Sequence, residues 1–261
     1  MLSNKLEYPI AILSDVNGNL EALEAVLADI KTQNIKSILF LSDAIGFGPN
    51  PAECLDLLRD TVNVYLLGQL EVFMLEQIYK NSPSPLRDKN LLAWPAKMLK
   101  KVPDPRRWRP RRIEWLASQP DIYKFDSFCA TYAPRELLGA PICPGRRIEG
   151  LTLKLESYFK AHRILILSGV KIPWYFRMDD SNYTEVNESR AIGIDAIAPV
   201  IVSAGSVGQP HDLNPKACYV IVTETKIFWR RVEYDVEKTV AKIKAIPILR
   251  PINASRLLKG I

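Results

Sequence analysis

The sequence is poor in the residues that metal centres, disulfide frameworks and membrane spans require. It has two histidines and four cysteines in 261 residues, and the cysteines form no CxxC pair. Neither a zinc cluster nor a disulfide framework is therefore indicated. No run approaches about 18 apolar residues, and the N-terminal MLSNKLEYP lacks the features of a secretory signal. We expect a cytoplasmic protein with no membrane contact and with reduced, mostly buried cysteines.

The composition is that of a folded domain. With 48% apolar and 25% charged residues, the chain is long enough for one large globular domain or at most two small ones. No internal repeat or low-complexity tract interrupts it.

The positive charge is concentrated in one segment. Between Lys97 and Arg112, eight basic residues against one acid give +7, which leaves −1 for the rest of a chain whose total is +6. Such a segment either forms a solvated helical face or binds nucleic acid or another polyanion. The residues expected to make a nucleic-acid interface are Arg106, Arg107, Trp108, Arg109, Arg111 and Arg112, with Trp94 and Trp115 nearby.

Hydrophobic periodicity predicts alternating strands and helices. The expected helices are residues 20–30 with Asn19 as the cap, 51–59, a proline-interrupted stretch over 71–119, and 236–245. The expected strands are Ile10–Leu13, Ser37–Leu41, Val62–Leu67, Phe125–Thr131, Ile164–Leu167, Val200–Ser203, Ala217–Thr223 and Lys226–Arg231.

Six segments in order carry a resemblance over about residues 9–235: SDVNGNLEAL, LSDAIGFGPNP, LLGQLE, ATYAPRE, SGVKIPW and AGSVGQPHD. They are similar to the calcineurin-like metallophosphoesterase superfamily, in its small bacterial YfcE-like phosphodiesterase branch. The resemblance implies an α+β fold, a four-layer α/β/β/α sandwich of two mixed sheets flanked by helices. We expect a single domain over 1–245 with a helical, basic insertion at about 72–120, and a partly mobile tail over 246–261.

In that family two divalent metals bind the phosphate and supply a hydroxide nucleophile, so the site needs carboxylates, neutral imidazoles and a general-acid histidine. Asp15 and Asp43 match the first and the bridging aspartate, and Glu71 fits the last place of its motif. The other positions carry different residues. The replacements are Asn17, Gln69, Leu70 at the general-acid place, Thr131, Gly169 and Lys171.

Three hypotheses follow. The first is a pseudoenzyme with a vestigial site, without a cofactor, that binds or scaffolds an unknown protein or polyanion. The second is a weak phosphoesterase, a hydrolase with Mn²⁺ or Mg²⁺ held by Asp15, Asp43 and Asn17, because hard cations accept oxygen ligands and water. The third is a nucleic-acid-binding protein that uses residues 97–112. Asp15 and Asp43 can also be read as structural carboxylates that cap loops.

Lys171 has a specific expected role. Without metals, Asp15 and Asp43 are two like charges at the floor of a cleft, which raises the pKa of at least one of them. We expect the Lys171 ammonium to lie between the two carboxylates, with Asn17 adding a hydrogen bond. The alternative is a solvated surface lysine.

Overall fold

A computed structural model gives the fold of the chain. It describes residues 6–83, 85–86, 88, 91–101, 111–132, 162–177, 180, 183–194 and 198–261. Cys143 and residues 106–109 of the expected nucleic-acid interface lie outside the described residues. In the described part no helix is long and apolar enough to cross a membrane.

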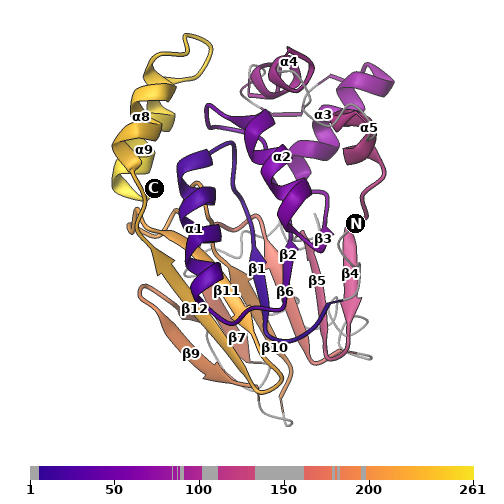
Figure 1. The fold of residues 1–261 in the computed structure, drawn as a ribbon, viewed down its shortest axis with the longest axis vertical. Helices are drawn as coiled ribbons and strands as arrows, with labels where there is room; N and C mark the ends of the chain where they lie inside the picture. The colour runs from indigo at the N-terminus through magenta and orange to yellow at the C-terminus, as the bar shows by residue number, and fades with distance from the viewer. Residues whose placement is uncertain are drawn as a thin grey trace.

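Two mixed six-stranded sheets form the centre of the molecule, with helices packed against them (Figure 1). The first sheet has the order β3-β2-β1-β11-β12-β9. Its strands are β1 (Ile10–Leu13), β2 (Ser37–Phe40), β3 (Val64–Tyr65), β9 (Arg190–Gly193), β11 (Ala217–Val222) and β12 (Lys226–Val232). β1, β2 and β3 are parallel, and the pairings β1–β11, β11–β12 and β12–β9 are antiparallel.

The second sheet has the order β4-β5-β6-β10-β7-β8. Its strands are β4 (Ile122–Phe125), β5 (Phe128–Tyr132), β6 (Ile164–Ser168), β7 (Pro173–Arg177), β8 (Thr184–Glu185) and β10 (Val200–Ala204). β5, β6 and β10 run parallel, while β4, β7 and β8 are antiparallel to their neighbours. The expected sandwich of two mixed sheets flanked by helices is thus confirmed.

Alternating burial along the strands builds two apolar layers. Ile10 and Ile12 of β1 face the second sheet and pack with Phe128 and Val202. Ala11 and Leu13 face the opposite way and pack against the helices. Because successive strand residues point to opposite faces, β1 is buried on both sides and its sequence IAIL is apolar throughout.

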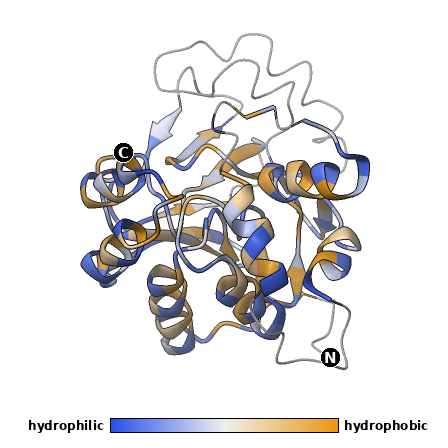
Figure 2. Ribbon diagram, turned by 90° about the horizontal axis from the view of Figure 1, so that it is seen from above, coloured by the Kyte–Doolittle hydropathy of each residue, from blue (hydrophilic) through white to orange (hydrophobic). Residues whose placement is uncertain are grey.

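Helices of the described part flank the first sheet. They are α1 (Leu20–Thr32), α2 (Pro51–Thr61), α3 (Gln69–Lys80), α4 (Ala93–Lys101), α5 (Arg112–Ala117), α8 (Val236–Lys244) and α9 (Pro251–Lys259). Viewed from above, the helices surround the strands and turn much of their hydrophilic surface outward (Figure 2). The expected Asn19 cap is present, because its side chain accepts a hydrogen bond from the Ala22 N–H.

Two segments differ in detail from the prediction. The strand expected over 125–131 begins at Phe128, as β5, because Asp126 adopts a left-handed conformation with φ 46° and turns the chain between β4 and β5. The segment 246–261, expected as a partly mobile tail, contains α9. Leu249, Ala254 and Leu257 bury their side chains against Val240 and Ile243 of α8.

Candidate functional site

The matched positions come together where β1, β2 and β6 end. Asp15 follows β1, Asp43 follows β2 and Lys171 follows β6. The loops after β1 and β2 are joined by backbone hydrogen bonds from Asp15 N to Ser42 O (2.9 Å) and from Asn17 N to Asp43 O (2.8 Å). The carboxyl ends of parallel strands are where α/β proteins place their sites.

Four of these residues share an unusual backbone conformation. Asp15, Asn17, Asp43 and Lys171 have φ values of 55°, 52°, 51° and 64°. Asp and Asn tolerate this left-handed region because their short polar side chains bond locally, whereas a lysine there costs about 1–2 kcal/mol. Clustered backbone strain of this kind is typical of functional sites.

Asp15 is fully buried. One carboxylate oxygen, Oδ2, accepts hydrogen bonds from Gly169 N at 3.1 Å and from the Ser14 hydroxyl. The other oxygen, Oδ1, is buried without a hydrogen-bond partner among the described residues. Burial raises the pKa of Asp15, while the Lys171 charge and the hydrogen bonds from Ser14 and Gly169 oppose that shift.

Asp43 is 3% exposed, and its Oδ1 accepts a hydrogen bond from Leu70 N at 3.0 Å. Burial and the negative charges of Glu71 and Asp15 hold the pKa of Asp43 well above its usual range. The site therefore has three carboxylates that lie close enough to influence one another.

Both carboxylate oxygens of Glu71 accept hydrogen bonds from the backbone. Its two oxygens accept hydrogen bonds from the N–H groups of Ala44 (2.6 Å), Asp43 and Gly68 (both 3.1 Å) and Ile45 (3.3 Å). The Tyr65 hydroxyl donates a fifth bond at 3.3 Å. Glu71 thus holds the β2–α2 loop in place and closes the start of α3.

Lys171 is directed inward, with 9% of the residue exposed. Its Nζ lies 3.5 Å from Oδ1 of Asn17, contacts Oε1 of Gln209, and stands 4.5 Å from the centre of the Phe47 ring. Burial lowers the pKa of Lys171, and the charges of Asp15 and Asp43 oppose this. The expected direct contact with the carboxylates is wrong: among the described contacts, the ammonium bonds two amide oxygens and attracts the carboxylates from further away.

The remaining positions of the family motifs, where other residues replace the expected ones, contribute no charge. The Gln69 amide oxygen accepts a hydrogen bond from the Tyr132 hydroxyl at 3.3 Å, and Leu70 is an apolar core residue. The Thr131 hydroxyl does not bond the carboxylates. It lies within hydrogen-bond distance of two backbone carbonyls, of Asp121 at 3.0 Å and of Tyr132 at 3.1 Å. Gly169 has φ 86°, and a Cβ there would lie 2.6 Å from the Tyr132 ring.

Three residues at the site were not among the expected site positions. Tyr132 covers Gly169, and its pKa is raised by burial and by the charges of Asp43, Asp15 and Glu71. Gln209 binds Lys171 from within the GSVGQP segment. Burial and the charges of Lys171 and Arg256 lower the pKa of His211 to about 4. The position of Tyr132 directly after a buried strand was the signal available for it.

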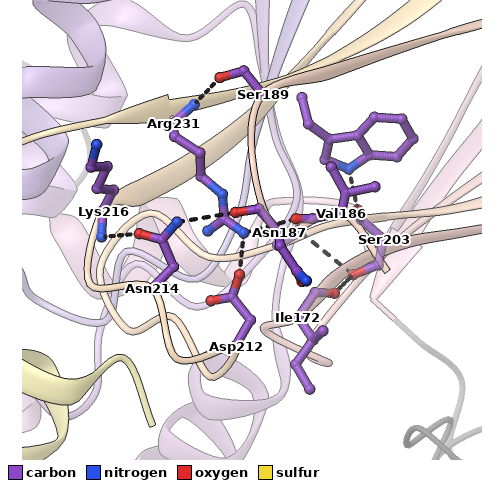
Figure 3. Close-up of polar contacts among 11 residues, drawn as sticks. Ile172, Val186, Asn187, Ser189, Ser203, Asp212, Asn214, Lys216 and Arg231 are labelled. Atoms are coloured by element: carbon purple, nitrogen blue, oxygen red, sulfur yellow. Dashed lines mark hydrogen bonds and ion pairs between the residues drawn. The ribbon is translucent and has the colours of Figure 1, made fainter. Parts of the chain in front are cut away.

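Polar contacts of Asp212 and Asn214 hold the loop that carries Gln209 and His211. Asp212 and Arg231 form an ion pair in which both side chains are 2% exposed. Arg231 also donates to Val186 O at 2.9 Å, and Asn214 donates to Asn187 O at 3.0 Å (Figure 3). Ser206 bonds the carbonyl of Asp15 at 2.9 Å, so the loop is fixed to the site as well.

The side-chain oxygens at this site do not suit a dinuclear metal centre. Both Glu71 oxygens hold backbone N–H groups, and Asn17 Oδ1 faces an ammonium. In the part of the chain that the structure describes, no three His, Cys, Asp or Glu side chains are grouped as a metal ion requires. Among the described residues, Asp15 Oδ1 is a buried carboxylate oxygen without a hydrogen-bond partner, of the kind that hard cations bind.

Two arginines of the basic segment lie among the described residues and differ in their surroundings. Arg111 is exposed, but Arg112 is 3% exposed and bonds Asp56 through Nη2 at 2.6 Å and through Nε at 2.9 Å. Arg112 is therefore a structural residue, which corrects its assignment as a nucleic-acid contact. Trp115 stacks under Arg59 at 5.2 Å and packs on Tyr65, so its ring is engaged within the protein.

Two packed, mixed six-stranded sheets, with polar residues gathered at the ends of β1, β2 and β6, match the metallophosphoesterase fold. The uncharacterized protein MJ0912 of Methanocaldococcus jannaschii is 30% identical over 242 residues, which are 90% of this chain and 91% of that protein. The chain belongs to the same protein family as this archaeal protein. No protein-family model matches it.

Two solved structures have the same fold. A metallophosphoesterase from Sphaerobacter thermophilus superposes with a TM-score of 0.76 at 24% identity, covering 97% of this chain and 99% of that one. The hypothetical protein PH1004 from Pyrococcus horikoshii gives a TM-score of 0.71 at 18% identity, covering 97% and 98%. At these identities the likeness concerns the fold.

Proposed function

We propose that the chain is a catalytically degenerate metallophosphoesterase, a pseudoenzyme that acts by binding or scaffolding a protein or polyanion partner. The observation that carries the proposal is the position of Lys171. Its buried ammonium bonds Asn17 and Gln209 beside Asp15 and Asp43, in the region where this fold would bind cations. A fixed positive charge there opposes cation binding and compensates the carboxylates instead.

The chemistry of the neighbouring positions supports the same proposal. The general-acid place carries Leu70, which has no proton to donate, and the loss of such an acid typically costs about 10²–10⁴-fold in rate. Glu71 is held by backbone donors, so it is not available as a general base.

The test is hydrolysis of bis-p-nitrophenyl phosphate with and without Mn²⁺, using the wild-type chain and Asp43→Asn. Asn keeps the acceptor for Leu70 N but removes the charge. The proposal predicts the same rate for both proteins, equal to that of a metal-only blank. Mn²⁺-dependent turnover that disappears in Asp43→Asn would overturn it.

A second candidate is a weak metal-dependent phosphoesterase. It is favoured by Asp15 Oδ1, a buried carboxylate oxygen without a hydrogen-bond partner in the described part of the chain. Mg²⁺ or Mn²⁺ on Asp15 and Asp43 would require the Lys171 ammonium to move away. Turnover that rises in Lys171→Ala would support this candidate.

Nucleic-acid binding by the basic segment remains a third proposal, and the exposed basic residues of its described part are Lys97, Lys100, Lys101 and Arg111. Because binding to phosphates releases counterions, retention on single-stranded DNA should fall steeply as salt rises. Retention that is unaffected by replacing Arg106, Arg107, Arg109 and Arg111 with Ser would remove it.

A further inference from the structure

One outer face of the molecule combines exposed aliphatic side chains with positive charge. It is formed by α4 and by the turn between α8 and α9, which both lie at the top of Figure 1. Two contacts join these elements. The Trp94 ring of α4 packs against the buried residues that α8 and α9 share, and Arg250 in the turn pairs with Asp88, just before α4, at 3.7 Å. Together they form the α4–α9 face.

Aliphatic side chains are exposed on this face. Ile248 and Ile252, four residues apart, are 37% and 43% exposed, and Leu258 further along α9 is 44% exposed. The side of α9 that contains Ala254 and Leu257 is already buried against α8. α9 therefore carries apolar residues on its outer side as well as on its inner side, and a helix that is apolar all round is normally covered. Grouped exposed aliphatic residues of this kind mark a surface that binds another body.

Positive charge lies beside these aliphatic residues. Neither α4 nor the stretch of residues 238–261 contains an acidic residue. The exposed lysines of the face are Lys97, Lys100 and Lys101 on α4 and Lys244 at the end of α8. Within the described residues none of these four lysines forms an ion pair, so their charge is not compensated.

The occupant of such a face should carry negative charge and also accept aliphatic side chains. Single-stranded nucleic acid stacks its bases on exposed aromatic rings, but Trp94 is engaged: its Nε1 donates to the Pro49 carbonyl at 3.3 Å and its ring packs on α8 and α9. A second copy of the chain is disfavoured, because a symmetric contact would bring the same lysines together. A fluid anionic bilayer accepts both the charge and the aliphatic residues of an outer helical face.

We infer that the α4–α9 face binds the surface of an anionic lipid bilayer: the lysines attract the lipid phosphates, and Ile248 and Ile252 insert among the head groups. Peripheral binding needs no membrane-spanning helix. The inference therefore departs from the expectation of no membrane contact, which rested on the lack of a long apolar run. It does not depend on whether the vestigial centre is active.

Cosedimentation of the full chain with lipid vesicles tests the inference. The chain should bind vesicles made of phosphatidylcholine and phosphatidylglycerol in equal parts, and it should bind pure phosphatidylcholine at least about tenfold more weakly. Binding should fall as the salt concentration rises, because salt screens the attraction between the lysines and the lipid phosphates. Equal binding to both kinds of vesicle, or binding to neither, would overturn the inference.

A triple variant on α4 tests the charge: Lys97→Gln, Lys100→Gln and Lys101→Gln. It should weaken binding to the mixed vesicles at least about tenfold, since each basic residue near an anionic surface contributes about fivefold in affinity. The matched control removes the same charge from exposed positions at the opposite end of the first sheet, near the end of α1 and the starts of β2 and β12: Lys31→Gln, Lys36→Gln and Lys226→Gln. Equal losses in the two variants would show that net charge alone drives binding and would overturn the inference.

A double variant, Ile248→Ser with Ile252→Gln, tests the insertion. It should weaken binding to the mixed vesicles at least about tenfold without changing the salt dependence, because it removes apolar area but no charge. The matched control is Leu213→Asn. Leu213 is 79% exposed and donates its N–H to the Gly260 carbonyl at the other end of α9, and asparagine tolerates its φ of 64°. Equal losses in the isoleucine variant and in this control would overturn the inference.

Hydrogen exchange of the unmodified chain covers the case in which a variant does not fold. Mixed vesicles should slow amide exchange in residues 97–101 and 244–252 but not in residues 31–36, and protection centred elsewhere would overturn the inference. Tighter binding to single-stranded oligothymidylate, lost in the lysine variant but kept in the isoleucine variant, would assign the face to nucleic acid instead. A dimer in sedimentation velocity that the isoleucine variant abolishes would assign it to a second copy.

Discussion

Lys171 and Asn17 meet across the ends of the two sheets: Nζ of the lysine, which follows β6, lies 3.5 Å from Oδ1 of the asparagine, which follows β1. This contact places a positive charge beside Asp15 and Asp43 in a buried environment. The carboxylates and the lysine therefore depend on each other for charge compensation, and the loss of the lysine should be measurable in several ways.

Lys171→Met should lower the free energy of unfolding by about 3–5 kcal/mol at pH 8, because it leaves buried carboxylates without their compensating charge. The loss should be smaller at pH 5. The pKa values of Asp15 and Asp43 are already raised, and without Lys171 these groups take up protons more readily. Urea unfolding at the two pH values measures both effects.

Lys171→Gly is the matched control, because glycine adopts the φ of 64° at this position without strain. It should be more stable than Lys171→Met by about 1 kcal/mol. A methionine variant within about 0.5 kcal/mol of the wild type would show that the ammonium contributes no more than a surface charge does.

Glu71→Gln should destabilise the chain by about 2–4 kcal/mol. One arm of the new amide is a donor and would face the backbone N–H groups of Asp43, Ala44 or Gly68, leaving buried donors unsatisfied. Glu76→Gln on the same helix removes only an exposed pair with Lys80 and should cost less than about 0.5 kcal/mol. Equal effects in thermal or urea unfolding would contradict the structural role of Glu71.

His211 should make the protein less stable as the pH falls. The pKa of His211 is about 4 in the folded state, against an ordinary value of 6.5. Between pH 6.5 and 4 the imidazole is therefore protonated in the unfolded chain and neutral in the folded chain. Allowing for partial solvent screening, the loss should reach about 1–3 kcal/mol near pH 4. His211→Asn should remove this part of the pH dependence. Parallel stability curves for the two proteins between pH 7 and 4 would contradict the prediction.

Substitutions of Arg112 and Arg111 should have different effects: the first should lower stability, and the second should weaken polyanion binding. Arg112→Met breaks the buried pair with Asp56 and should cost about 3–5 kcal/mol without changing the salt concentration that elutes the folded protein from heparin. Arg111→Ser should leave stability unchanged and lower the eluting salt concentration if the segment binds polyanions. Equal shifts in elution for both variants would show that Arg112 contacts the ligand.

The local sequence was sufficient for much of the fold. The apolar run IAIL predicted a short strand, and Asn19 before a helical apolar pattern predicted the start of α1. The C-terminal helix had clear signals too, with Pro251 at its first turn and Gly260 just after its end. The expectation of a mobile tail gave these signals too little weight.

The site was predictable in its positions but not in its contacts. The family resemblance placed Asp15, Asp43 and Lys171 at one site, and the structure brings them together. The partner of Lys171 depends on the loop after β10, where Gln209 lies 38 residues further along the chain. Nothing in the local sequence indicates that this amide, rather than a carboxylate, would bind the ammonium.

Equilibrium Mn²⁺ binding tests the central claim most directly, with the free ion measured by electron paramagnetic resonance for the wild type and Asp43→Asn. The account predicts that both proteins leave the free-ion signal equally unchanged, because Lys171 supplies the charge compensation that metals would otherwise provide. Two Mn²⁺ ions bound per wild-type chain, with binding lost in Asp43→Asn, would contradict it.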